Sequence, residues 1–310
     1  MNIAFFTEMS FTGKITRTHE NMRTEFAWMC ALNADHYHIS LDPTPIKDYD
    51  LGIIIIPKKN PGFNINLIKK FCDKVAVMQE GPHWYFQDYP LPEQVWYYNT
   101  LVDADIIFTH NECDRIYYQG LTDHDDVRVM KSLMIDDAVG RLDDVKRAGV
   151  IIGGNFVNWY GGFDSYIVAR DITESDEHVF APSMGRKQAM EEDVVSLLPY
   201  MNWKQWIHKL NEFKIGIHLM RTHAAGTFAL NCAYLGIPCI GYEGLDTQMI
   251  LHPDLTVKIG DLVSAKQLAK KLRKDEEFYL YCSNKAKNNY KELYHEDKFN
   301  TTFKEQFKIS

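Results

Sequence analysis

The stretch "FKIGIHLMRTHAAGTFALNCAYLGIPCIGYEG", residues 213–244, decides the fold that we predict for this chain. It reads as a buried strand, a turn of small residues, an apolar helix that ends at Gly236, and a second buried strand after Pro238. Strands and helices in this order are typical of a parallel sheet covered by helices. His223, Thr227 and Asn231 recur at intervals of four, so we expect them near one face of the helix.

The same alternation of apolar strands and helices runs along the whole chain. The charged segment "GRLDDVKRA", residues 140–148, interrupts it, and "GVIIGGNF" at 149–156 starts it again. We therefore predict two α/β domains, residues 1–146 and 147–310, each with a mainly parallel sheet covered on both faces. In the first domain we expect strands at 2–6, 50–57, 75–80 and 104–110, and helices at 18–32 and 66–74.

Composition limits the class of protein. The 310 residues are 45% hydrophobic and 25% charged, which is typical of a globular protein with two domains. A net charge of −8 gives no support for broad electrostatic binding of nucleic acid. Six cysteines without a CxxC pair indicate reduced thiols, no signal peptide is recognisable, and no apolar run is long enough to span a bilayer. We therefore expect a cytoplasmic protein without a membrane span.

The start of the predicted helix is suited to a diphosphate. A helix N-terminus offers free backbone N–H groups and the positive end of the helix dipole. Ala224, Ala225 and Gly226 have little or no side chain to obstruct the approach of a diphosphate, Thr227 is expected on the same helix face as Asn231, and Arg221 adds a charge. Asn231, two turns further on, is a candidate ligand of a ribose. A core helix that tolerates a few polar residues is the alternative interpretation.

This segment resembles the nucleotide-sugar segment of GT-B glycosyltransferases. In many retaining members two glutamates eight residues apart bracket the helix, which ends in Gly-x-Pro. Gly236-Ile237-Pro238 matches that end, while His223 and Asn231 stand at the glutamate positions. The resemblance implies two Rossmann-like domains that face each other across a cleft, with C-terminal helices packing back toward the first domain. It also implies a nucleoside-diphosphate sugar, such as a UDP-sugar, as donor substrate, and no cofactor.

The segment "VIIGGNFVNWYGGF", residues 150–163, resembles the start of the nucleotide-binding half of bacteriophage DNA β-glucosyltransferases. That resemblance implies that the strand and turn at Gly153, Gly154 and Asn155 contact the donor. The arginines that follow in that family are replaced here by Val157, Asn158 and Trp159. The candidates for binding the diphosphate are therefore Arg221, Arg186 and Lys187.

The segment "KVAVMQEGPHWYFQDYP", residues 74–90, supplies a candidate general base. Glu80 ends an apolar strand, where a carboxylate can take a proton from an acceptor hydroxyl. In the phage family an aspartate ends the equivalent strand and acts as base. His83 and Asp88 are rival bases, and Trp84 is a candidate platform for a sugar ring or an extruded base. A packed aromatic loop beside a surface acid is the alternative.

The first loop, residues 7–19, is the fourth candidate site segment. In GT-B enzymes this loop lies over the acceptor and the donor phosphates. Gly13 provides flexibility, and Lys14 and Arg17 provide positive charge. For each of these residues a solvated loop is the alternative interpretation.

Several other classes of site lack their motifs. The sequence contains no GxxxxGK[ST], no HExxH and no GxGxxG after a strand. Asp48-Tyr-Asp50 and Asp103-Ala-Asp105 have DxD spacing but precede apolar strands, and the twelve histidines are dispersed. We therefore expect no metal site.

These observations predict a glycosyltransferase that moves a sugar from a nucleoside diphosphate to an acceptor hydroxyl. With Glu80 as base the reaction inverts the anomeric centre, and a retaining reaction stays open. The phage resemblance favours DNA with a hydroxymethylated base as acceptor and partner. A surface glycan or a small molecule is the alternative acceptor. A non-catalytic nucleotide-sugar-binding protein and a sugar-nucleotide epimerase are the alternative functions.

Overall fold

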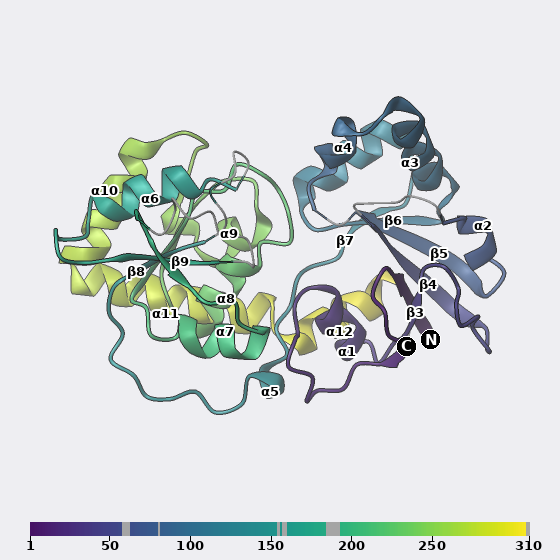
Figure 1. The fold of residues 1–310 in the computed structure, drawn as a ribbon, viewed down its shortest axis with the longest axis horizontal. Helices are drawn as coiled ribbons and strands as arrows, with labels where there is room; N and C mark the ends of the chain where they lie inside the picture. The colour runs from purple at the N-terminus through teal and green to yellow at the C-terminus, as the bar shows by residue number, and fades with distance from the viewer. Residues whose placement is uncertain (58–62, 80, 154–155, 157–159, 184–192, 308–310) are drawn as a thin grey trace.

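Two parallel sheets, one after the other in the chain, form the framework of the protein (Figure 1). The computed structural model describes residues 1–57, 63–79, 81–153, 156, 160–183 and 193–307. The first sheet has the strand order β2-β3-β1-β4-β5-β6-β7 and the second the order β10-β9-β8-β11-β12-β13. The strands of the first sheet are β1 Ile3–Thr7, β2 Gly13–Lys14, β3 Asp35–His38, β4 Tyr49–Ile56, β5 Cys72–Gln79, β6 Ile106–Thr109 and β7 Val127–Val129. Those of the second are β8 Val150–Ile152, β9 Val179–Pro182, β10 Ser196–Leu198, β11 Ile215–His218, β12 Cys239–Tyr242 and β13 Thr256–Val257.

The described helices connect these strands and cover the sheets. The α-helices are α1 Glu25–Ala31, α2 Ile65–Ile68, α3 Leu91–Asp103, α4 Glu112–Thr122, α5 Asp136–Val139, α6 Gly162–Arg170, α7 Trp203–Leu210, α8 Thr227–Leu235, α9 Asp246–Leu251, α10 Leu262–Lys274, α11 Glu276–Leu293 and α12 Glu296–Gln306. Two 3₁₀ helices are η1 His83–Asp88 and η3 Pro253–Leu255. None of the described helices is long and apolar enough to cross a membrane.

Three local predictions differ from the structure. The helix expected at 18–32 begins only at Glu25, because residues before it turn back, with the Asn21 N–H donating to His19 Nδ1. The helix expected at 66–74 ends at Ile68, since Cys72 already pairs with Tyr49 in the sheet. The first loop contains the short strand β2, the antiparallel member of an otherwise parallel sheet.

The apolar strand β4 explains why the first sheet is covered on both faces. Ile53 and Ile55 belong to one buried apolar cluster, whereas Ile54 and Ile56 belong to the cluster on the other face. This follows from the alternation of side chains along a strand. A strand that is apolar at every position therefore requires helices on both faces.

One apolar cluster continues from the first domain into the second. It joins Phe5 and Phe108 of the first sheet to Trp206 and Phe228 of the second domain. A core shared in this way fixes how the domains face each other.

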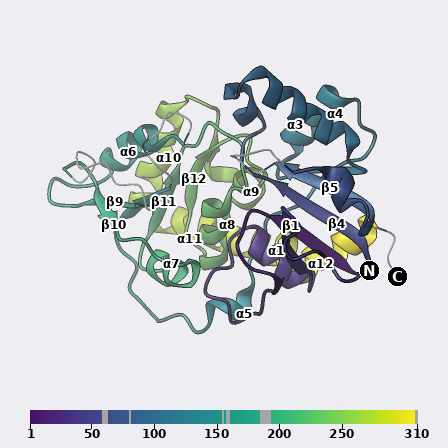
Figure 2. The ribbon, with the colours of Figure 1, turned by 45° about the vertical axis from the view of Figure 1, so that its right-hand side comes forward.

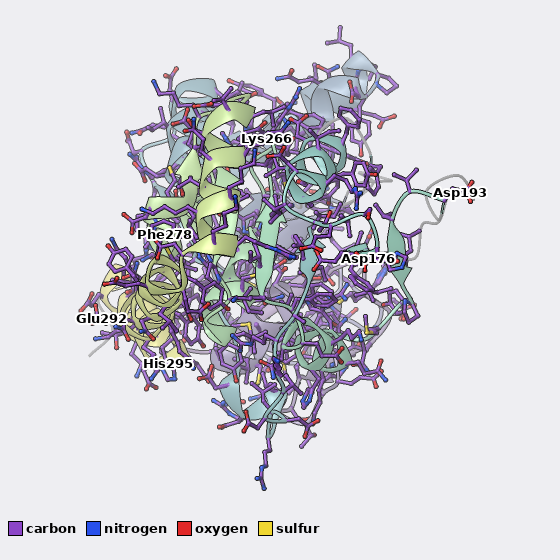
Figure 3. All side chains as sticks on the ribbon, turned by 90° about the vertical axis from the view of Figure 1, so that its left-hand side faces the viewer. Asp176, Asp193, Lys266, Phe278, Glu292 and His295 are labelled. Carbon is purple, nitrogen blue, oxygen red and sulfur yellow. The ribbon has the colours of Figure 1, made fainter. Side chains whose placement is uncertain are left out.

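The C-terminal helix α12 returns to the first domain, as the GT-B resemblance implied (Figures 1 and 2). Its Phe303 ring and the Phe307 ring that follows it lie 6.4 and 6.3 Å from the Phe108 ring of β6. At its start, Glu296 binds the Arg17 guanidinium through both carboxylate oxygens. The preceding helix, α11, stays on the second domain, where Figure 3 shows Phe278 and Glu292 along it and Lys266 on the neighbouring α10.

Replacing Phe303 with alanine should lower the free energy of unfolding by about 3–5 kcal/mol, the usual cost of truncating a buried aromatic side chain. The side chain of Phe303 lies on the face of α12 that packs on the first sheet, and it is only 4% exposed. Urea denaturation followed by tryptophan fluorescence measures the change. Phe163→Ala, at a side chain 66% exposed, is the control and should change stability by less than about 0.5 kcal/mol. Equal stability of the two variants would contradict the packing role of α12.

Candidate functional site

A cleft of about 350 Å³ lies between the two domains. This volume is within the usual range for small-molecule sites, which is about 300–1,000 Å³. The cleft is found where the strands of both sheets end, which is where ligands bind in open parallel α/β sheets. Its lining from the first domain includes Arg23, Thr24, Glu25, Gly81 and His110. Its lining from the second domain includes Ser183, Tyr200, Trp203, His218, Gly226, Thr227 and Asn231.

The N-terminus of α8 opens into this cleft. Gly226 is the N-cap residue, with φ at +64°, and no side chain among the described residues caps the helix. A Cβ at Gly226 would lie 2.0 Å from Thr247 Oγ1, so both the backbone and the space require glycine. The first N–H groups of the helix are therefore available to an anion in the cleft.

The loop before α8 is held by residues of the first domain. The Asn111 side-chain amide donates to the Ala224 carbonyl at 2.9 Å, and the Ser132 hydroxyl donates to the Ala225 carbonyl at 2.7 Å. Since Ala224 and Ala225 both line the cleft, the first domain sets the shape of the turn before α8 in the second.

Three polar side chains on the cleft wall have polar atoms without a hydrogen-bond partner among the described residues. These atoms are both ring nitrogens of His218, Nδ1 of His110 and Oδ1 of Asn231. His218 is 6% exposed and Asn231 3% exposed. Buried polar atoms without partners are costly, so on a cleft wall these atoms are available to water or to a polar ligand. Burial lowers the pKa of both His110 and His218 to about 4, which keeps the rings uncharged near neutral pH.

Three of the predicted donor-site residues meet at this cleft, namely Gly226, Thr227 and Asn231. Arg221 lies just outside the lining. Its Nη2 is 2.7 Å from Asp164 Oδ2, and the same oxygen accepts from the Tyr242 hydroxyl at 3.0 Å. Hydrogen bonding to Asp164 raises the pKa of Arg221 above its usual value. Gly153 packs behind the wall, where a Cβ would lie 2.7 Å from Phe228.

His223 does not share the helix face with Thr227 and Asn231, because α8 begins only at Thr227. It lies in the preceding loop, and its Nδ1 is 3.0 Å from Cys113 Sγ and 3.8 Å from Asp114 Oδ1. The predicted acceptor residue His83 reaches the same carboxylate, with Nδ1 3.0 Å from Asp114 Oδ1. The structure thus brings together two histidines that were predicted for different substrates.

The other predicted acceptor residues lie outside the lining of the cleft. Gly13 and Lys14 form β2 at the sheet edge, where Lys14 Nζ donates to Asn33 Oδ1 at 3.0 Å. Arg17 binds Glu296, as described above. Trp84 and Asp88 belong to η1, and Asp88 is exposed. Their roles with substrate stay predictions.

Five predicted site residues fall outside the described part of the chain: Glu80, Gly154, Asn155, Arg186 and Lys187. Their roles also stay predictions. Gly81, which follows Glu80, lines the cleft.

Two cleft histidines, His110 and His218, and the aromatic lining residues Tyr200, Trp203 and Trp206 were not predicted from the sequence. A signal for the histidines was present, because His110 and His218 each stand at the carboxyl end of an apolar strand. The aromatic lining residues had no such signal, since they come from a loop and a helix whose place depends on tertiary packing.

Comparisons with known proteins identify the fold. No protein-family model matches the sequence, and no curated protein matches it. Among solved structures, a mutant of TarM from S. aureus, in complex with Fondaparinux, alpha-GlcNAc-glycerol and UDP, is 12% identical with a TM-score of 0.66. The match covers 87% of this chain but only 58% of the TarM chain.

Two further structures match over nearly their whole length. HepE of Anabaena, in complex with UDP and glucose, is 10% identical with a TM-score of 0.70, and the match covers 100% of both chains. An alpha-glucosyltransferase in complex with UDP and a 13-mer DNA containing an HMU base is 14% identical with a TM-score of 0.64. That match covers 100% of this chain and 98% of the other. The chain therefore has the GT-B fold, with two parallel-sheet domains.

Replacing Gly226 with alanine should cost more than about 1 kcal/mol of stability, because alanine is strained at positive φ and its Cβ would meet Thr247. Thermal and urea unfolding measure the change. Gly120→Ala is the matched control, since Gly120 lies within α4 and a Cβ there meets nothing within 4 Å. The control should be neutral or stabilise by up to about 1 kcal/mol. A neutral Gly226 variant would show that the turn tolerates a side chain.

Proposed function

We propose that the protein is a glycosyltransferase that moves a sugar from a UDP-sugar to an acceptor hydroxyl. The observation that carries this proposal is the cleft itself, where the uncapped α8 N-terminus meets the unpartnered polar atoms of His218 and Asn231. A helix N-terminus is suited to a diphosphate, and a buried amide one turn further along the helix is suited to a ribose. The solved structures with UDP bound share this fold and support the choice of nucleotide.

In this proposal the diphosphate lies against residues 224–227, and the developing charge on the leaving phosphate is stabilised by their N–H groups. Asn231 contacts the ribose. Tyr200 and Trp203, which also line the cleft, are our candidates for packing against the base. Arg23 brings a positive charge to the cleft and is fixed by donating to the Met201 carbonyl at 3.3 Å. Arg221, Arg186 and Lys187 are further candidate ligands of the diphosphate.

Glu80 is our candidate for the base that activates the acceptor hydroxyl. It follows β5, whose end faces the cleft through the neighbouring Gly81. A carboxylate there would take the hydroxyl proton as the oxygen attacks the anomeric carbon, with UDP leaving from the opposite side and inversion of the centre.

For the acceptor we propose a hydroxymethylated base in DNA. The alpha-glucosyltransferase solved with DNA supports this choice. The net charge of −8 restricts any DNA contact to a local surface, because broad phosphate neutralisation needs many basic groups.

Incubating the protein with UDP-glucose or UDP-GlcNAc and either hydroxymethylated or unmodified DNA, followed by mass spectrometry of the nucleosides, tests this acceptor. Transfer to a glycan or small alcohol, with neither DNA modified, would exclude DNA while keeping the glycosyltransferase activity.

Asn231→Ala should weaken UDP binding by about 1–3 kcal/mol, the scale of a lost buried hydrogen bond, and should change pyrophosphate binding much less. The reason is that Asn231 lies one turn beyond the anion-binding end of α8. Isothermal titration calorimetry with both ligands measures the difference. Asn288→Ala, at an exposed position of α11, is the control and should leave both affinities unchanged. Equal losses for UDP and pyrophosphate would contradict a ribose contact.

Glu80→Gln should lower turnover by about a hundredfold to ten-thousandfold, the range of general base catalysis, with little change in UDP affinity. Initial rates with a UDP-sugar, measured against pH, also separate the two proteins, because the wild-type rate rises through a carboxylate titration that the variant lacks. Glu292→Gln, the same substitution at an exposed residue of α11, should keep normal turnover. Near-normal turnover of Glu80→Gln would shift the role to His83 or Asp88, or favour a retaining reaction.

A further inference from the structure

Three side chains that can bind a metal meet where the two domains touch, and a cysteine lies beside one of them. The nitrogen Nδ1 of His83 and Nδ1 of His223 lie 3.0 and 3.8 Å from the same atom, Asp114 Oδ1. Their three ligand atoms all lie within 4.8 Å of one another. Cys113 Sγ approaches His223 Nδ1 to 3.0 Å from the side of α4.

These separations suit a small tetrahedral ion. Nitrogen and oxygen ligands about 2.0–2.2 Å from zinc stand roughly 3.4 Å apart in a tetrahedron. The two separations from Asp114 Oδ1, 3.0 and 3.8 Å, bracket that value, and the ligand atoms of the two histidines lie within 4.8 Å of each other. Two imidazoles, a carboxylate and a thiol are also a ligand set that favours zinc over magnesium or calcium. We propose that His83, Asp114 and His223 bind a Zn²⁺ ion, with Cys113 Sγ as the fourth ligand.

The neighbours of these residues hold them in the orientation that an ion needs. The Asn111 side-chain amide donates to Asp114 Oδ2 at 2.9 Å and leaves Oδ1 to face the histidines. The His83 ring lies against Tyr117, with ring centroids 4.0 Å apart. Gly244 packs on the opposite edge of the His223 ring, since a Cβ there would lie 2.1 Å from Nε2. A hydrogen bond to the second oxygen of a ligating carboxylate, such as that from Asn111, is typical of metal sites.

We expected no metal site from the sequence, because these residues are dispersed along it. His83 comes from η1, Cys113 and Asp114 from the first turn of α4, and His223 from the loop before α8. The ion would therefore bridge the domains and fix the loop that leads into the cleft. Among the described residues that line the cleft, none is a proposed ligand, so the ion has a positioning role.

A hydrogen-bonded cluster without a metal is the competing interpretation. In that case the His83 N–H donates to Asp114, and Cys113 and His223 pair with each other. The two interpretations differ in metal content and in the spectrum of a cobalt-substituted protein.

The test uses the full chain without a histidine tag. Metal content by plasma mass spectrometry after exhaustive dialysis should be about one zinc per chain. After removal of zinc by a chelator, Co²⁺ should restore binding, with the visible absorption of tetrahedral cobalt and a near-ultraviolet thiolate band. Zinc should also raise the melting temperature of the metal-free protein, because binding to the folded state stabilises it.

Variants assign the ligands. Asp114→Asn and His223→Gln should each weaken cobalt binding by more than about a hundredfold, beyond the loss expected for an outer contact. Cys113→Ser should keep the visible bands and lose the thiolate band. His38→Gln is the control, because His38 bonds the nearby Ser40 at the end of β3 and should change nothing.

Wild-type protein that binds no zinc and gives no tetrahedral cobalt spectrum would overturn the proposal, whatever the folding of the variants. Metal binding that persists unchanged in Asp114→Asn would overturn it as well. Neither result bears on UDP binding, so the proposed transferase function is tested separately.

Discussion

The arrangement of the two domains depends on the side-chain amide of Asn111, which bonds to residues of both domains. Its nitrogen donates to the Ala224 carbonyl and to Asp114 Oδ2, and its oxygen accepts from the Asp246 N–H at 3.0 Å. The residue is 1% exposed, so each of these bonds replaces water that the site excludes. Losing a partner here would leave a buried polar group unpaired, at a cost of about 1–3 kcal/mol. One amide therefore positions the loop before α8 and the carboxylate of the histidine cluster together.

This contact also explains how a cleft between domains keeps a defined shape. The α8 N-terminus belongs to the second domain, but the two carbonyls just before it are bound by Asn111 and Ser132 of the first. The shared apolar core also holds the two domains together. The Arg17–Glu296 ion pair holds the start of α12 on the first domain. A donor bound on the second domain would consequently be presented to the first in a set orientation, which is what an in-line transfer requires.

The sequence predicted those features that depend on local pattern. The strand β4 was recognisable because four consecutive isoleucines must be buried on two faces. The end of α8 was recognisable because a glycine, Gly236, stands two residues before Pro238, and in the structure that glycine has φ of +70°. The cluster of His83, Cys113, Asp114 and His223 was not predictable, since three separate segments contribute to it. His223 shows the limit most clearly. Its spacing indicated a helix face, yet the helix begins four residues later because Gly226 takes a left-handed conformation that starts it there.

The return of α12 to the first domain means that the chain passes between the domains twice, once along residues 130–149 and again where α11 gives way to α12. Two connections, or tethers, therefore link the two domains. The exposed residues 143–146 of the first tether are accessible to a protease. A single cut there would leave the halves joined through the second tether and through the packing of Phe299 and Phe303, so a nicked protein would still migrate as one particle.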